Sequence, residues 1–269
     1  MLLTWNSLGN IFLKLALLFV VSNILNVMAT STPALATQER WAPIEEIIVV
    51  ARKREERLQD VPISVSVFSA DDIASAGIRS MADIANLTPG LTIAPLFGVD
   101  FWTPVIRGLS TTIGEPNVGF FIDGVYQGSR TSMPQLLGNF IDHIEVARGP
   151  QSALYGRNTF GGAINYVTRR PSDTLEGELD ATFGDYGERH LQGGLGGPLS
   201  PDGWYYRVSG LWEEFDGYFH NHLTGGELDA SDTDGLLFTI DGALWDSVIA
   251  TLNLGYENTS SGDNPLLFV

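Results

Sequence analysis

The 269-residue chain is long enough for one or two domains with a substantial core, and it contains no cysteine, which excludes disulfides and thiolate metal sites. Its formal net charge of −17 is concentrated after residue 170, because residues 171–269 carry two arginines and 18 acidic residues. Residues 1–170 are nearly balanced, with 13 basic and 14 acidic residues. This abrupt change in net charge after residue 170 predicts two regions of the chain in different surroundings. The excess of acidic residues excludes nucleic acid as an expected partner, because binding to phosphates needs basic patches.

The first 36 residues have the organisation of an export signal. Lys14 precedes the apolar run 15–21, and the small-residue pattern Ala34-Leu35-Ala36 follows. Polar residues interrupt the rest of the apolar segment, which leaves it short of the roughly 20 residues that a membrane-spanning helix needs. We therefore predict a signal peptide at residues 1–36, cleaved after Ala36.

A short β-branched segment, Ile44–Val50, precedes the first predicted domain and favours an extended conformation. A charged run, Arg52–Arg57, follows it. With no expected strand partner close in sequence, the segment is suited to add itself to a sheet edge of another protein. The alternative is an N-terminal strand of the following domain, and the residues alone favour neither.

Residues 58–170 predict a small α+β domain. The alternation in Val61–Phe68 predicts a strand, after which Ser69 with an aspartate three residues on predicts a helix that ends at Gly77. A second helix is expected from Ser80 to about Asn86. A hairpin turn is expected at residues 123–124, a short helix at 151–155, and further strands at 91–94, 105–107, 119–122, 125–126, 143–148 and 163–168.

This region contains no pattern that predicts catalysis. There is no nucleophile elbow, and the glycine-rich stretch 156–162 lacks the Lys-Ser/Thr pair of a phosphate-binding loop. We expect no enzymatic activity and no cofactor.

Several motifs of the region, taken together and in this order, resemble the plug domain of TonB-dependent outer-membrane receptors. They are Gln59–Val65, Ile84–Leu91, Ile106-Arg107-Gly108, Phe121–Val125, Ile144–Pro150 and Leu154–Asn165. The resemblance implies a plug inside a 22-stranded barrel in the outer membrane of a Gram-negative bacterium. It implies uptake of a scarce nutrient, most often a ferric siderophore, with TonB and its inner-membrane energising complex as partners.

The resemblance also implies roles for individual residues. The preceding segment resembles the TonB box that pairs with TonB, and it consists of Ile44, Glu45, Glu46, Ile47, Ile48, Val49 and Val50. Arg107, Glu145 and Arg148 match positions of a polar plug–barrel lock, the alternative being a local surface pair of Glu145 with Arg148. Substrate contacts are expected from two loops, at Pro95–Thr103 and Tyr126–Arg130, through Phe97, Phe101, Trp102, Tyr126 and Arg130.

Residues 171–269 contain five runs in which apolar and polar residues alternate, as in transmembrane β-strands. We expect a periplasmic turn at 197–203 and an extracellular loop at 214–233. That loop contains His220 and His222, which define no third ligand and therefore no expected metal site. Aromatic residues near the strand ends are typical of barrel girdles: Trp204, Tyr205, Trp212, Tyr218 and Trp245. A soluble sandwich is the alternative, but the signal, the plug and the strands agree on a membrane barrel.

Five strands in 99 residues (171–269) occupy about 20 residues each, so a 22-stranded barrel needs roughly 340 residues more. We therefore predict a truncated receptor that transports nothing by itself. Rival functions within the resemblance are a signal-transducing receptor and uptake of a carbohydrate or cobalamin. A passive porin is a third alternative, and the predicted plug domain disfavours it because a plug blocks an open pore.

Overall fold

The computed structural model describes residues 48–49, 56–57, 59, 61, 63–95, 102–111, 114–128, 140–201, 203–222, 225–245 and 248–262. The chain divides into two compact units at Arg169/Arg170. Among the described residues, no helix has the length and apolar character needed to cross a membrane.

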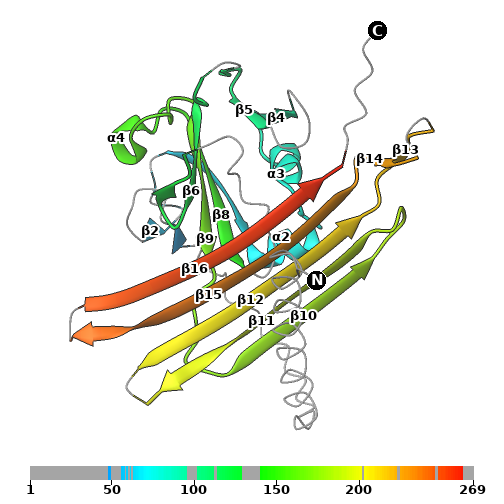
Figure 1. Cartoon of the computed structure of the whole chain (residues 1–269). Helices are drawn as coiled ribbons and strands as arrows, with labels where there is room; N and C mark the ends of the chain where they lie inside the picture. Colours follow the sequence, from blue (N-terminus) through cyan, green and yellow to red (C-terminus); the bar gives the residue numbers. More distant parts are fainter. Residues whose placement is uncertain are drawn as a thin grey trace, which may run out of the picture. The chain divides into compact units, whose positions relative to one another are not determined.

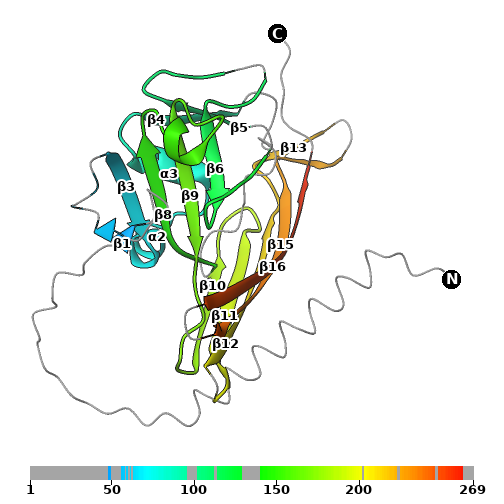
Figure 2. The same cartoon turned by 90° about the vertical axis from the view of Figure 1, so that its left-hand side faces the viewer.

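The first unit is built on a five-stranded sheet with the strand order β3-β8-β9-β6-β7, and Figure 2 shows β3, β8, β9 and β6 of this sheet. Neighbouring strands are antiparallel except β6 and β9, which are parallel. The strands are β3 (Ser64–Ser69), β6 (Val118–Ile122), β7 (Val125–Tyr126), β8 (Ile141–Arg148) and β9 (Gly162–Thr168). Two smaller antiparallel pairs are separate from this sheet: β1 (Ile48–Val49) with β2 (Glu56–Arg57), and β4 (Leu91–Pro95) with β5 (Trp102–Ile106).

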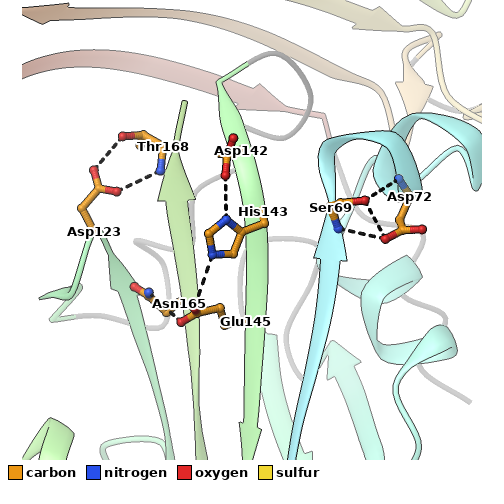
Figure 3. Close-up of polar contacts among 8 residues, drawn as sticks. All are labelled: Ser69, Asp72, Asp123, Asp142, His143, Glu145, Asn165 and Thr168. Carbon is orange, nitrogen blue, oxygen red and sulfur yellow. Dashed lines mark hydrogen bonds and ion pairs between the residues drawn. The ribbon is translucent and has the colours of Figure 1, made fainter. Parts of the chain in front are cut away.

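The helices of this unit begin where the sequence predicts. In α2 (Ala70–Ser75), the Ser69 hydroxyl accepts from the Asp72 amide at 3.1 Å, and the Asp72 carboxylate accepts from the Ser69 amide at 3.0 Å (Figure 3). α3 (Met81–Leu87) begins with the same reciprocal cap, formed by Ser80 and Asp83. These capping boxes satisfy amide groups that a helix leaves unpaired at its first turn. A single turn, α4 (Ser152–Tyr155), precedes β9.

The core of the first unit lies on β6, β8 and β9. Phe120, Ile144, Ile164 and Tyr166 are all 1% exposed or less, and each such side chain stabilises the fold by roughly 1.5–3 kcal/mol relative to exposure. Gly162 lets the backbone of β9 lie close to that of β8, because a Cβ there would lie 2.5 Å from the Ala147 carbonyl oxygen.

The second unit is an antiparallel meander with the order β10-β11-β12-β15-β16, which Figures 1 and 2 show as a long curved sheet. Its strands are β10 (Glu176–Phe183), β11 (Arg189–Ser200), β12 (Trp204–Phe215), β15 (Ser231–Trp245) and β16 (Val248–Ser261). The five predicted strands are therefore present. The loop between β12 and β15 is shorter than predicted and contains a small strand pair, β13 (Phe219–His220) and β14 (Glu227–Leu228).

The register places the apolar residues of all five strands on one face. Leu195 is opposite Val208, Val208 is opposite Phe238, and Phe238 is opposite Leu254. This apolar face is open at the edge strands, where Phe183 is 78% and Leu254 57% exposed, and its inner residues Val208 and Phe238 are half-buried. Apolar side chains gathered on one open face, with polar side chains on the other, are the arrangement of a lipid-facing sheet.

Candidate functional site: the plug and its adjoining strands

Part of the predicted TonB box, the pair Ile48–Val49, forms β1 in the first unit. β1 pairs with β2, and Ile48 is opposite Arg57 while Val49 is opposite Glu56. The expectation that this segment lacks a strand partner close in sequence is therefore wrong, because a pairing of two residues with the charged run leaves no alternating pattern to detect. Ile44–Ile47 and Val50 lie outside the described residues.

Val49 anchors β1 on the unit. Its side chain is 1% exposed and forms a cluster with Val61, against which Ile63, Val65 and Val67 of the β3 region pack. Burial of a valine stabilises this docked position by roughly 1.5–3 kcal/mol. A partner strand can add to the edge of β1 that β2 does not occupy, or it must first compete with β2 and with this burial.

Two of the predicted lock residues, Arg107 and Arg148, come together around one turn. The Arg107 amide donates to the Gly90 carbonyl at 2.9 Å, and its backbone is left-handed with φ at 51°. Its guanidinium extends over Gly149, where a Cβ would lie 3.4 Å from Arg107 Nη1. Arg148 donates from Nη1 to the Pro89 carbonyl at 3.0 Å. Both guanidiniums are thus directed to one end of the unit, where Arg107 is exposed.

The third predicted lock residue, Glu145, points elsewhere. It is 1% exposed, and its Oε2 accepts from Asn165 Nδ2 at 3.2 Å. The alternative of a surface pair with Arg148 is wrong, because Glu145 is buried and residues three apart on β8 face opposite sides of the sheet. Its contacts give Glu145 partners inside the unit, and its role in a plug–barrel lock stays a prediction.

His143 balances the buried charge of Glu145 (Figure 3). Its Nε2 lies 3.3 Å from Glu145 Oε1, and its Nδ1 lies 2.7 Å from Asp142 Oδ2. Burial lowers the pKa of His143, but the hydrogen bonds and charges of these two carboxylates outweigh it and raise the pKa to about 9. The imidazolium is therefore the stable form at neutral pH. Burial, together with the charge of Glu145, also raises the pKa of Tyr155 far above its usual value.

The side chain of Asn165, which contacts Glu145, also holds the predicted turn between β6 and β7 in place. The Gly124 amide donates to Asn165 Oδ1 at 3.0 Å, which connects Glu145 to the turn through one side chain. The Asp123 carboxylate accepts from the Thr168 amide at 2.8 Å and from the Thr168 hydroxyl at 2.7 Å (Figure 3). Asp123 and Gly124 have φ of 49° and 76°, as this tight hairpin turn requires. Sequence reasoning found the turn but missed these side-chain bonds.

Of the predicted substrate-contacting residues, Phe97, Phe101 and Arg130 lie outside the described residues. Trp102 lies in β5 opposite Pro95, so the first predicted loop connects a hairpin. The Tyr126 hydroxyl donates to Glu115 Oε2 at 3.3 Å and accepts from Asn158 Nδ2 at 2.7 Å. Tyr126 thus joins two loops of the first unit, and its contact with a substrate stays a prediction.

In the second unit, a buried arginine on the polar face crosses a neighbouring strand. Arg207 of β12 is 3% exposed and forms ion pairs with Glu178 and, at 3.4 Å, with Glu176 of β10. It passes over β11 at Gly194, where a Cβ would lie 2.8 Å from Arg207 Nη2. Arg189 of β11 pairs with Glu214 of β12 at 2.8 Å. Sequence reasoning missed these three ion pairs.

Comparison with known proteins agrees with this architecture. Residues 57–163 match the family model described as the TonB-dependent Receptor Plug Domain. The chain is 30% identical over 199 residues to the pesticin receptor of Yersinia pestis, covering 72% of this chain and 29% of the relative. It is 30% identical over 201 residues to the ferrichrome outer membrane transporter/phage receptor of Escherichia coli K12, covering 68% of this chain and 25% of the relative.

The structure is likewise similar to the crystal structure of the ferric yersiniabactin uptake receptor FyuA from Yersinia pestis. The TM-score is 0.68 at 28% sequence identity, over 73% of this chain and 32% of that chain. The chain thus spans between a quarter and a third of the length of these relatives. The matched plug and the antiparallel strands that follow it show that this chain belongs to the family of TonB-dependent receptors of the bacterial outer membrane.

Proposed function

We propose that this chain serves in the energised uptake of a ferric chelate, most often a siderophore, across the outer membrane. The observation that carries the proposal is a plug domain joined to a sheet whose apolar face is open. Its relatives point to the same cargo, since they include a ferric yersiniabactin uptake receptor and a ferrichrome transporter. The role is one of transport and involves no catalysis.

In this proposal TonB binds the segment Ile44–Val50 as an added strand. The main-chain hydrogen bonds of such a pairing transmit a pull to β1 and then to Val61 and β3, which is the edge strand of the plug sheet. Arg107 and Arg148 hold the plug to carboxylates of the barrel wall through bonds that are strong but reversible. The predicted substrate-contacting segments, Pro95–Thr103 and Tyr126–Arg130, meet the substrate.

We further propose that residues 1–269 by themselves transport nothing. The five strands form an open sheet with β10 and β16 at its edges. Hydrocarbon offers no hydrogen-bonding partner to the backbone groups of an open edge, so the membrane requires more strands to close the sheet.

The test of the uptake proposal is the transport of radiolabelled iron chelates into cells that express this sequence as part of a receptor with a closed barrel. We expect uptake that is lost in cells without TonB and in a Val49→Pro variant, since proline removes a main-chain donor from the added strand. The matched Val49→Ile variant should retain uptake. Equal uptake with and without TonB would refute the proposal.

A further inference from the structure

Two histidines in the loop between β12 and β15 lie next to each other, His220 in the small strand β13 and His222 in the turn that follows it. His220 is opposite Glu227, and the ring of His222 lies 5.5 Å from that of His220, centroid to centroid, at an angle of 74°. Two imidazoles that bind one tetrahedral ion through bonds of about 2.0–2.1 Å have their centroids about 5 Å apart. The two rings are therefore close enough to share one ion when a nitrogen of each turns toward it.

Glu227 provides what the sequence pattern alone lacks, because it orients one of the two rings. Its Oε1 lies 2.9 Å from His220 Nδ1. When the Nδ1–H group of His220 donates a hydrogen bond to this carboxylate, Nε2 has no proton, and its lone pair is available to a metal ion. A carboxylate on the second nitrogen is the usual surrounding of a metal-binding histidine, since it fixes the tautomer and makes the ring a better ligand.

The surroundings of the pair also favour a cation. Both histidines are exposed, with the His220 side chain 48% open to solvent, so an ion can reach them. Asp216 and Asp229 lie in the same loop, and residues 171–269 have 18 acidic side chains against two basic ones. A negative potential of this kind raises the local concentration of divalent cations.

We propose that His220 and His222 form a two-imidazole site for a divalent transition-metal ion, with Glu227 as the positioning residue. The proposal concerns a site that is independent of the uptake function. Within the described ranges, no three side chains of His, Cys, Asp or Glu are grouped to hold a metal, and the proposed protein ligands are the two imidazoles. Among such ions, imidazole sites bind Cu²⁺ most tightly, ahead of Ni²⁺ and Zn²⁺.

The test is a Cu²⁺ titration of the whole tag-free chain in detergent micelles, followed by electron paramagnetic resonance. We expect one saturable ion whose spectrum shows nitrogen ligands, and its loss in His220→Ala and in His222→Ala. Both side chains are exposed, so these variants should keep their β-sheet circular dichroism. Binding should weaken as the pH falls, because protons compete with the ion for the imidazole nitrogens.

The control for the carboxylate is Glu214→Gln, which removes the same charge from the same end of the sheet but from a partner of Arg189. We expect Glu227→Gln to weaken Cu²⁺ binding about tenfold, as loss of an orienting carboxylate does, and Glu214→Gln to weaken it by much less. Equal effects of the two variants would overturn the positioning role. A saturable ion that survives removal of both histidines, or no saturable binding by the unchanged chain, would overturn the site itself.

Discussion

Replacement of His143 by glutamine should remove most of the pH dependence of plug stability between pH 6.5 and 9. In the folded plug, Asp142 and Glu145 raise the pKa of His143 from 6.5 to about 9. The folded state therefore holds this proton more tightly than the unfolded chain does. The stabilisation is fully present below pH 6.5 and is lost as the pH rises through 9.

The magnitude follows from the size of the shift. A rise from 6.5 to about 9 corresponds to about 3 kcal/mol, because each pKa unit is worth about 1.4 kcal/mol. The His143 side chain is only 13% exposed, so solvent screens this interaction little. Glutamine can still donate to Glu145 but has no proton to lose in this range, and a buried carboxylate without a cation should make this variant less stable near neutral pH.

The assay is hydrogen exchange of the β8 and β9 amides, measured by mass spectrometry from pH 6 to 9.5 and corrected for the intrinsic rates. The free energy of opening should fall with pH in the unchanged protein and stay nearly level in His143→Gln. A parallel fall in both proteins, or protection that increases with pH in the unchanged protein, would refute the assignment of this proton to His143.

Two further substitutions test the two units, each against a matched control. Gly162→Val should destabilise the plug by about 1–3 kcal/mol in urea unfolding, because its Cβ would lie 2.5 Å from the Ala147 carbonyl oxygen. Gly128→Val has open space around it and should have little effect, and equal losses would contradict the packing. Leu254→Arg should oppose insertion into lipid vesicles by about 2–4 kcal/mol, whereas Asn253→Arg on the polar face should be tolerated. Insertion that is insensitive to Leu254→Arg would contradict the lipid-facing register.

Features that depend on a few neighbouring residues could be predicted from the sequence. The reciprocal pairing of Ser69 with Asp72 is complete within four residues, so the start of α2 follows from its local pattern. The turn at Asp123-Gly124 is equally local. The five strands of the second unit were predictable because one open apolar face imposes a period of two along each of them.

Features that depend on register across strands could not be predicted. Asn165 reaches Glu145 only because β8 and β9 pair these residues directly. Arg207 reaches β10 across the strand between them and passes close to Gly194. The pairing of β1 with β2 is two residues long, too short to produce a periodic pattern. The spacing of His220 and His222 was visible in the sequence, but the carboxylate that orients one ring comes from β14.

The central claim, that the N-terminal extended segment binds TonB, is tested most directly by disulfide crosslinking in cells. The chain contains no cysteine, so a disulfide crosslink formed by a variant with a single cysteine at one of positions 44–50 can be assigned to that position. With a cysteine in the periplasmic domain of TonB, we predict crosslinks from Ile48→Cys and Val49→Cys that increase when a transported chelate is added. The control Ser75→Cys, exposed on α2, should give none. Crosslinks that are no stronger at positions 44–50 than at Ser75 would contradict the claim.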